Sequence, residues 1–340
     1  MIEHRNVFLS LFKKYIQNVL RVNFLKRNVT PISCALYVTR KCNFKCSYCI
    51  VRDNREYNLS LNETKRLLGL IREEIPSITI TGGEPLLRRD IVEILREAER
   101  LRFYPISLFT NLSLIDRKLD VLNYINMLST SLDSLNSKND TIIGVKGATE
   151  LIIRNIKKYS KLQKQKKFIM NINCVISKDN FDDVLDVARF AFANDCLLSI
   201  GIVVNNGIPQ KELINNEKYI KVMDELIKLK KKRYPISNSL KYLKTIRDFK
   251  SFRCHPFLIP RILSNGLIGY PCNLQIQKTT NILDHESFKD VLAELENNHY
   301  FECSKSCYLG CYAMPSILIE SPMVMIKEFM AFTAKIRSKT

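Results

Sequence analysis

The chain of 340 residues lacks several features that would restrict its function. It has no apolar run of the length that a membrane-spanning helix needs, and no secretory signal. It also has no internal repeat, no low-complexity tract and no tryptophan, although the last absence excludes nothing. Acidic residues are few, because 34 Asp and Glu stand against 53 Lys and Arg, which gives a formal net charge of +19. We therefore expect a protein without membrane spans that attracts anionic partners.

The excess of positive charge leaves more than one kind of partner open. An anionic membrane surface or an acidic substrate would suit it, and a lysine-rich source proteome would produce it without any function. The lysines are spread over the expected helices, with one basic run at residues 228–233. There is no Gly/Arg-rich tail and no helix lined with base-reading residues, so we expect no nucleic-acid partner.

Cysteine is abundant, at eleven residues, and without a secretory signal this indicates a reducing compartment and metal ligation rather than disulfides. Cys42, Cys46 and Cys49 fall within eight residues, on a loop after an expected buried strand at 35–39. Three thiolates from one loop can hold three corners of a cubane [4Fe–4S] cluster and leave its fourth iron open. A structural zinc site is the alternative, but no histidine lies nearby to complete it.

The rest of the chain alternates between expected strands and helices. Strands are expected at 35–39, 77–81, 105–110, 126–132, 167–176 and 197–204, and helices at 61–74, 89–102, 116–124, 148–165, 181–194 and 211–232. Six βα units in series predict an α/β fold, with a parallel sheet curled into a partial (β/α)6 barrel. Catalytic residues should then lie on the loops at the carboxyl ends of the strands.

The alternation stops near residue 235, where Pro, Gly and Cys become frequent. We therefore divide the chain into an amphipathic helix at 1–30, the partial barrel at 31–240, a small Cys-rich domain at 241–314 and an apolar helix at 315–340. Asn265-Gly266 predicts a hairpin turn within the Cys-rich domain.

A second motif, Gly82-Gly83-Glu84-Pro85, follows the second expected strand. Two glycines let the backbone approach a ligand closely, and a carboxylate beside them can accept hydrogen bonds from an ammonium group. Alone, the motif could be a simple turn. Its place after the second strand, with the cysteines after the first, indicates a shared site.

Together, the C-x-x-x-C-x-x-C spacing with Tyr48 before its last cysteine, and the GGEP motif, resemble the signature of the radical S-adenosylmethionine (SAM) superfamily. The resemblance implies a [4Fe–4S] cluster on Cys42, Cys46 and Cys49, and SAM bound beside Tyr48 and the glycines, with Glu84 on its amino group. It further implies that SAM is cleaved reductively to a 5′-deoxyadenosyl radical, which removes hydrogen from an unactivated carbon. An external one-electron donor of the ferredoxin or flavodoxin type would supply the electron.

Other positions fit the resemblance less closely. Those that imply SAM contacts at later strand ends are Asn111, Ser131, Asp133, Asn173 and Ile202. Leu112 stands where relatives often have Gly. Ile143 stands where they often have an Arg that pairs with the SAM carboxylate, so Lys146 is a substitute. Each of these residues could instead be an ordinary strand-end or core residue.

A second group of cysteines resembles a SPASM or twitch auxiliary-cluster domain, with one extra residue between Gly266 and Cys272. Its members are Cys254, Cys272, Cys303, Cys307 and Cys311. Five thiols suit one four-ligand cluster with one to spare, so a second, auxiliary [4Fe–4S] cluster is implied. A zinc knuckle or free thiols are the alternatives. Cys34, Cys174 and Cys196 are expected in the core.

The apolar segments at the two ends of the chain are the evidence on the class of substrate. Residues 8–25 form an amphipathic helix, with Asn18 on its polar face, which either packs under the barrel or lies in a membrane interface. The apolar, Met-containing segment 315–336 either packs as a helix or forms part of a substrate surface. Similar features occur in radical SAM enzymes that join archaeal tetraether lipid chains or adenosylate hopanoids.

We therefore expect a membrane lipid as substrate, with C–C bond formation or a similar modification of an isoprenoid chain, by a cytoplasmic enzyme peripheral to the inner membrane face. The first alternative is a SPASM-type peptide maturase, although about 33 residues before the first strand are too few for a winged-helix leader-recognition domain. The second is a non-enzymatic iron–sulfur scaffold or electron carrier, which has no use for GGEP. The oligomeric state is not predicted.

Overall fold

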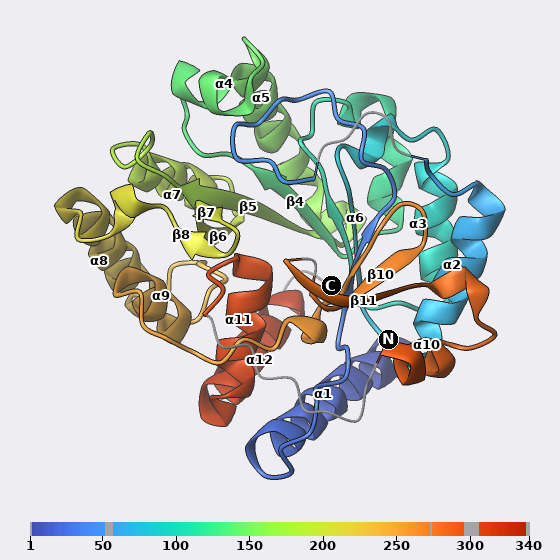
Figure 1. Ribbon diagram of the computed structural model, residues 1–340. Helices are drawn as coiled ribbons and strands as arrows, with labels where there is room; N and C mark the ends of the chain where they lie inside the picture. Colours follow the sequence, from blue (N-terminus) through green and yellow to red (C-terminus); the bar gives the residue numbers. More distant parts are fainter. Residues whose placement is uncertain (1, 52–56, 273, 296–305, 338–340) are drawn as a thin grey trace.

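A single nine-stranded sheet organises the protein, as the computed structural model shows for residues 2–51, 57–272, 274–295 and 306–337 (Figure 1). Its order is β11-β10-β9-β1-β2-β3-β4-β5-β6. The strands β1 to β6 are parallel neighbours in chain order. They comprise β1 (Cys34–Tyr37), β2 (Ile78–Thr81), β3 (Ile106–Phe109), β4 (Met127–Ser131), β5 (Ile169–Ile176) and β6 (Leu197–Ile202). The predicted α/β fold with six parallel strands is confirmed.

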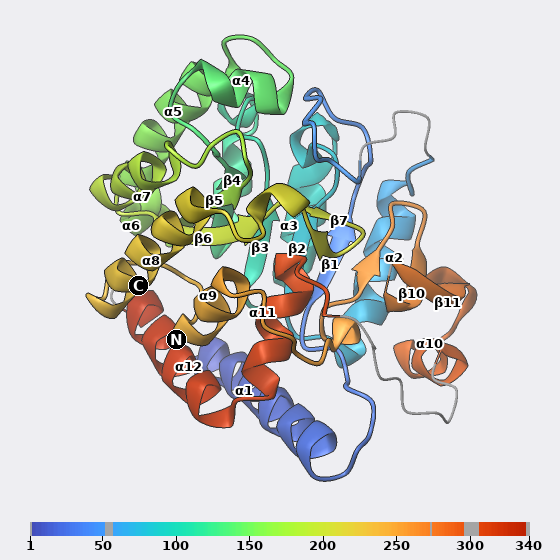
Figure 2. The ribbon, with the colours of Figure 1, turned by 60° about the vertical axis from the view of Figure 1, so that its left-hand side comes forward.

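Helices connect the parallel strands and cover the outside of the sheet (Figures 1 and 2). Those of the strand–helix series are α2 (Leu61–Glu74), α3 (Ile91–Arg100), α4 (Ser137–Ile143), α5 (Ala148–Tyr159), α6 (Gln163–Lys166), α7 (Val184–Ala193), α8 (Glu217–Lys231) and α9 (Leu240–Arg247). The 3₁₀ turns are η1 (Pro85–Leu87), η2 (Ile115–Arg117), η3 (Leu119–Asn123), η4 (Ser160–Leu162), η5 (Lys211–Leu213), η6 (Pro256–Leu258) and η7 (Ile282–Asp284). α2 begins with the capping box that Ser60 and Glu63 form.

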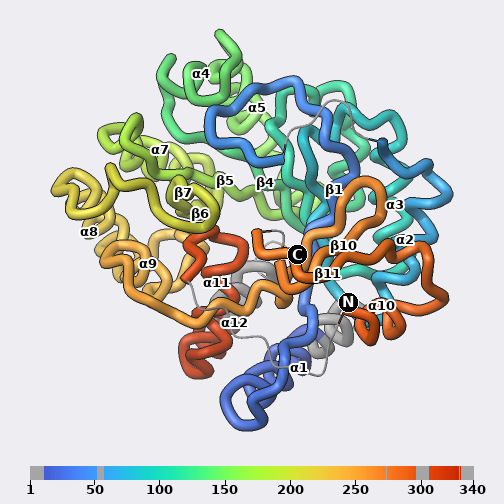
Figure 3. The backbone as a smooth tube through the Cα atoms, in the orientation of Figure 1, coloured from blue at the N-terminus to red at the C-terminus, as the bar shows by residue number. Residues whose placement is uncertain are grey.

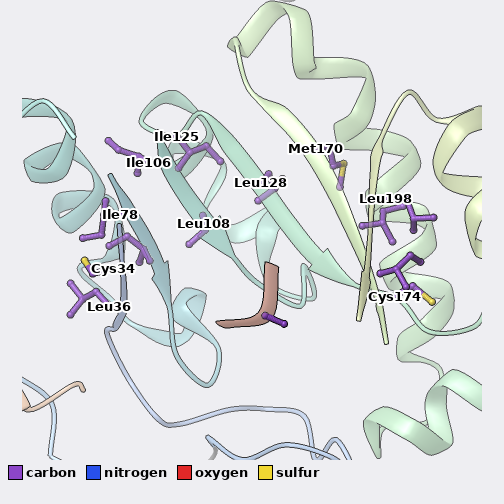
Figure 4. Close-up of a cluster of buried hydrophobic side chains, with 14 of the residues drawn as sticks. Cys34, Leu36, Ile78, Ile106, Leu108, Ile125, Leu128, Met170, Cys174 and Leu198 are labelled. Carbon is purple, nitrogen blue, oxygen red and sulfur yellow. The ribbon is translucent and has the colours of Figure 1, made fainter. Parts of the chain in front are cut away.

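The core lies between the sheet and these helices. Figure 4 shows buried side chains from β1 to β6, among them Leu36, Leu108 and Leu128, which are at most 1% exposed. Parallel strands buried on both faces need such apolar side chains. Cys34 and Cys174 belong to the same cluster (Figure 4), and Cys196 is also fully buried, so the prediction of three core cysteines is confirmed.

Three expected helices differ from the structure. Segment 116–124 forms the turns η2 and η3 instead of an α-helix, and the Asp116 carboxylate accepts a hydrogen bond from Tyr159 there. The helix expected at 148–165 is interrupted after Tyr159 by η4. The helix expected at 211–232 begins only at Glu217, where Asn216 caps it.

The C-terminal half continues the same sheet. β9 (Arg261–Ile262) pairs in parallel with β1, and β10 (Leu267–Cys272) and β11 (Gln275–Asn281) follow as antiparallel strands. Figure 3 shows β10 and β11 next to each other. The predicted hairpin is present, because Gly266 turns the chain between β9 and β10 with a φ of 86°. A two-stranded ribbon of β7 (Val204–Asn205) and β8 (Ile208–Pro209) lies apart from the sheet. The domain division near residue 240 stays a prediction, while the sheet runs on across it.

The two ends of the chain pack together below the sheet (Figure 2). They form α1 (Ile2–Asn23), α11 (Gly310–Ile319) and α12 (Pro322–Arg337), whereas α10 (Phe288–Leu295) packs against α2 and β11. Val19 of α1 packs against Leu318 and Met325, so both expected helices pack against the fold. The segment expected at 315–336 is two helices, because Pro322 has no N–H group to continue α11. None of the described helices is both long and apolar enough to cross a membrane.

One prediction about α1 is wrong. The helical pattern places Asn18 on the polar face, but its side chain is fully buried. Its Nδ2 donates to the carbonyl oxygen of Thr30 at 3.0 Å, and its Oδ1 accepts from the Thr30 N–H at 2.7 Å. A buried amide is tolerated because these bonds satisfy it, and they attach α1 to the segment that leads into β1.

Candidate active site

The three cysteines of loop 42–49 come together at the carboxyl end of β1. All three line one cavity of about 430 Å³. Cys42 and Cys46 are partly buried, whereas Cys49 is exposed. Burial raises the pKa of the Cys46 thiol to about 12, so this thiol becomes a ligand only when a metal replaces its proton. Three soft thiol donors on one cavity wall fit the predicted [4Fe–4S] cluster.

The loop is held from behind by the end of α4. The backbone N–H of Lys45 donates to the carbonyl oxygen of Ile143, and that of Ser47 to Ile142, each at 2.9 Å. Gly144 ends α4 with a φ of 69°, and a Cβ at this position would lie 2.8 Å from the Lys45 carbonyl oxygen. Glycine is required here both by the backbone angle and by the close approach of the loop.

The glycines of the GGEP motif bring a second loop against the first. The Gly83 N–H donates to the Thr39 carbonyl oxygen, and the Glu84 N–H to that of Lys41, each at 2.8 Å. A Cβ on Gly82 would lie 2.1 Å from the Thr39 oxygen, and one on Gly83 would lie 2.2 Å from the Lys41 oxygen. Both glycines line the cavity, so they are required for contact between the loops and also leave backbone open to a ligand.

Glu84 itself lies behind the cavity wall. Its carboxylate is fully buried and accepts hydrogen bonds from Thr110 Oγ1 at 2.7 Å, from Asn111 N at 2.7 Å and from Leu86 N at 2.9 Å. Burial raises its pKa to about 7. Protein donors bond this carboxylate, and Glu84 does not line the cavity, so its direct contact with the SAM amino group stays a prediction. The hydrogen bond from the Asn111 N–H to Glu84 holds Asn111 in place.

Asn111 faces the cavity, as expected. Its Nδ2 donates to Asn43 Oδ1 at 2.9 Å, and Asn43 Nδ2 donates to Ser113 Oγ at 2.9 Å. Asn43 belongs to the cysteine loop, so these amides connect the loop to the end of β3. Sequence reasoning missed Asn43, although it lies directly after the first cysteine of the motif.

Asp133 also lies behind the cavity wall. It is buried, it does not line the cavity, and it accepts hydrogen bonds from Tyr48 Oη at 2.5 Å and from the Val175 N–H at 2.8 Å. Burial raises the pKa of Asp133 to about 6. Asp133 thus supports Tyr48, which does line the cavity, between two of the cysteines, while its own contact with SAM stays a prediction.

The remaining predicted contacts face the cavity from neighbouring strands. Ser131 ends β4 and pairs in register with Asn173 of β5, and Ile202 ends β6. All three line the cavity, so the structure brings them together with the cysteine loop. Lys146, expected in place of the missing arginine, does not line the cavity, whereas Ile143 does.

The cysteines of the C-terminal group lie in two places. Cys254 and Cys272 are buried beside Tyr312, and Cys307 packs against the same group. Cys311 instead lines the main cavity. The fifth cysteine, Cys303, falls outside the described residues.

No three His, Cys, Asp or Glu side chains within the described ranges converge on a point where a single metal ion could sit. A cubane cluster separates its thiolates more widely, because each of them binds a different iron. The thiol donors in both places therefore remain suited to clusters, and an iron–sulfur protein on a partial barrel is the class that this fold and site define.

Two further cavity residues were missed by sequence reasoning. Tyr37 ends β1, and Arg261 begins β9, which pairs with β1. Arg261 donates from Nη2 to Cys311 Sγ at 3.1 Å. The sequence signal that could have indicated Arg261 is a lone charge between apolar neighbours, in the run Ile259-Pro-Arg-Ile-Leu263.

Comparison with protein families agrees with this assignment. Residues 36–191 match the model of the radical SAM superfamily, and residues 198–331 match a domain of unknown function (DUF3463). Residues 36–191 are thus similar to the radical SAM superfamily, and enzymes of that superfamily use a [4Fe–4S] cluster and SAM.

Curated relatives include the GTP 3′,8-cyclase of Synechocystis, which is 34% identical over 162 residues, or 45% of this chain and 48% of that protein. The sporulation killing factor maturation protein SkfB of Bacillus subtilis is 30% identical over 184 residues, or 50% of this chain and 44% of that protein. The chain thus spans about half the length of these relatives.

Solved structures share the fold at low sequence identity. Streptococcus suis SuiB superposes with a TM-score of 0.61 at 22% identity, over 80% of this chain and 67% of that one. The structure of anSMEcpe with bound AdoMet superposes with a TM-score of 0.58 at 19% identity, over 87% of this chain and 98% of that one. These likenesses include the C-terminal part of the fold.

Proposed function

We propose that this protein cleaves SAM reductively and uses the resulting radical to remove hydrogen from an unactivated carbon of a peptide. The observation that carries the proposal is the shared cavity of about 430 Å³, which the three cysteines of loop 42–49 line together with the paired glycines and the strand-end residues. An electron carrier would need the cysteines, but it would not need the paired glycines or the strand-end residues beside them.

When bound, the cluster and SAM supply the electron and the 5′-deoxyadenosyl radical, after reduction by an external ferredoxin- or flavodoxin-type donor. The chain's own residues bind and orient these groups. Gly82 and Gly83 offer backbone groups, and Ser131 and Asn173 offer polar side chains on neighbouring strands. Apolar residues such as Ile202 line the same cavity and exclude water from it.

The peptide is favoured over the expected membrane lipid by the relatives. SkfB is named as a maturation protein for the sporulation killing factor, and SuiB has been solved bound to its precursor peptide SuiA. The relatives named above do not carry the name of a lipid-modifying enzyme. We further propose an auxiliary [4Fe–4S] cluster on the C-terminal cysteines, because Cys254, Cys272 and Cys307 lie together.

A membrane lipid is retained as a second candidate because of exposed apolar side chains at the packed termini. Phe24 and Leu25 are 74% and 58% exposed just after α1, and Met323 is 69% exposed at the start of α12. The side chain of Asn23 joins these segments by donating to the Ile319 carbonyl oxygen at 3.2 Å. Such groups next to basic residues suit a membrane surface.

The reaction is tested on protein reconstituted anaerobically. With SAM and dithionite, the protein should release 5′-deoxyadenosine. Cys46→Ala should release none, and Cys196→Ser is the matched control, because Cys196 is buried away from the cavity and Ser can keep its hydrogen bond to the Asn194 carbonyl oxygen. If wild-type protein with a full iron complement forms no 5′-deoxyadenosine, the enzymatic proposal fails.

The substrate class is tested by isotope transfer. Peptides and lipids are prepared separately from cells grown in deuterated medium and offered to the reconstituted enzyme. The 5′-deoxyadenosine should gain deuterium from the peptide fraction and none from vesicles of the lipid fraction. Transfer from the vesicles alone would replace the peptide by the lipid candidate.

A further inference from the structure

A buried guanidinium faces the candidate active site and has few partners. Arg261 is 8% exposed and lines the same cavity as the three cysteines of loop 42–49. Its Nη2 donates to Cys311 Sγ at 3.1 Å, and its guanidinium carbon lies 5.1 Å from the centre of the Tyr312 ring. A cation is costly to bury unless charges and hydrogen bonds compensate for lost water, so its partners indicate its role.

Arg88 shows how this chain satisfies a buried arginine that serves the fold. Its side chain is 9% exposed and pairs with both oxygens of Asp90. It also donates to the carbonyl oxygens of Val38 and Leu59 and to the Thr64 hydroxyl. A carboxylate and three neutral acceptors thus compensate for the burial of this cation.

Arg261 has no comparable set of partners. Among the described residues it donates one side-chain hydrogen bond, to a thiol, and the charges that act most strongly on its pKa belong to a thiol and two phenols. A guanidinium has five N–H donors. No nitrogen of the Arg261 side chain is both inaccessible to solvent and without a hydrogen-bond partner. The donors that do not bond Cys311 are therefore open to the cavity. A fork of such donors matches the paired oxygens of a carboxylate or phosphate.

We propose that Arg261 binds an oxyanion of the substrate, namely a carboxylate of the peptide, so that the enzyme takes an acidic peptide. The peptide part of this inference rests on the proposed function. β9 flanks β1 on the side opposite β2, whereas the predicted SAM contacts other than Tyr48 follow β2 to β6. The anion is therefore assigned to the substrate and not to the carboxylate of SAM. The net charge of +19 also attracts an acidic peptide.

The oxyanion site is tested by calorimetric titration of the reconstituted full chain with pyrophosphate. Arg261→Gln should weaken pyrophosphate binding about 10- to 100-fold, the size expected when charge-assisted hydrogen bonds are lost, and Arg261→Lys should fall between. Arg189→Gln removes the same charge from a side chain that is 71% exposed, and should change the dissociation constant less than about twofold. Equal affinity in Arg261→Gln and wild type overturns the inference.

Two further arms separate the competing explanations. If the Cys311 thiolate is the counter-ion that Arg261 needs, pyrophosphate will bind to Cys311→Ser and not to wild type, which overturns the inference. If Arg261 binds the carboxylate of SAM, saturating SAM will displace pyrophosphate, which overturns the assignment to the substrate. We expect Cys311→Ser to bind like wild type, and SAM to leave pyrophosphate bound.

The peptide is tested with acetyl-Glu-Glu-amide and its neutral match acetyl-Gln-Gln-amide. The acidic dipeptide should compete with pyrophosphate in wild type, and the neutral one should not. If neither dipeptide competes while pyrophosphate binding still depends on Arg261, the assignment of an acidic peptide as substrate is overturned and the oxyanion site stands. The proposed reaction fails separately, by the absence of 5′-deoxyadenosine.

Discussion

Removal of the Tyr48 hydroxyl tests how the cysteine loop is held to the sheet. Tyr48 donates to Asp133 at 2.5 Å, and the Val175 N–H is the other donor to this buried carboxylate. A hydrogen bond to a charged group contributes about 1.5–3 kcal/mol to the free energy of unfolding, and one between neutral groups about 1 kcal/mol. Tyr48→Phe should therefore cost about 2 kcal/mol when Asp133 is ionised, and about 1 kcal/mol when it is protonated.

The cost should depend on pH in a defined direction. Burial raises the pKa of Asp133 to about 6 in the native state, above its ordinary value of 3.8, so the native protein is stabilised by protonation of this group and loses that contribution as the pH rises through 6. The hydrogen bond from Tyr48 lowers this pKa, and without it the ionised form is less stable still. The difference between wild type and Tyr48→Phe should therefore grow as the pH rises through about 6.

Denaturant unfolding followed by circular dichroism at pH 5 and pH 8 measures both quantities. Tyr57→Phe is the matched control, because that side chain is 64% exposed, and it should change stability by less than about 0.5 kcal/mol at either pH. A second readout is the rate at which a chelator removes iron, which should rise in Tyr48→Phe. Equal losses of stability at the two pH values would refute the hydrogen bond to an ionised Asp133.

Three other predictions concern the same site. Cys46→Ala should hold about four fewer irons per chain than wild type in a colorimetric iron assay, because one cubane is lost. Gly83→Ala should lower the free energy of unfolding by about 3 kcal/mol, since its Cβ would lie 2.2 Å from a backbone oxygen. Gly69→Ala is the control, because a Cβ on Gly69 meets nothing within 4 Å, and it should stabilise α2 by up to about 1 kcal/mol in the same unfolding experiments. Burial raises the pKa of Glu84 from 4.5 to about 7, so the free energy of unfolding should fall as the pH rises from 4.5 to 7, and Glu84→Gln should flatten that fall.

The parallel strands could be predicted because their signal is local. Each of the six is an apolar run between turn or helix signals, and each lies within a few residues of its expected place. The error on Asn18 has a different source. A helical wheel places a side chain on a face, but it cannot show that the following segment folds back and satisfies a buried amide.

The site was predictable where a motif presents its own side chains or backbone to the ligand. The cysteine loop and its two neighbouring glycines line the cavity as expected. Glu84 and Asp133 follow equally clear strand ends, yet both are turned away into buried hydrogen bonds. Sequence position places a residue at the end of a strand, but the direction of its side chain depends on which donors the neighbouring strands supply.

The pairing of β9 with β1 lets both halves of the chain contribute residues to one cavity. Ala35 of β1 lies in register with Arg261, more than two hundred residues later, and this contact places a cation from the C-terminal half beside the cysteine loop. No local pattern encodes such a pairing. The segment matched by the radical SAM model supplies the cysteines and glycines, and the segment matched by the domain of unknown function completes the cavity.

This arrangement also weighs against a lipid drawn directly from a membrane at the packed termini. α1 leads into the amino end of β1, whereas the cysteine loop follows its carboxyl end. Phe24 and Leu25, the exposed apolar residues after α1, therefore lie at the opposite end of this strand from the cavity. A lipid chain bound there would have to pass the buried core to reach the cysteines. A peptide that enters the cavity beside Arg261 needs no such path, because this cation lines the cavity and its hydrogen bond is to a thiol among the described residues.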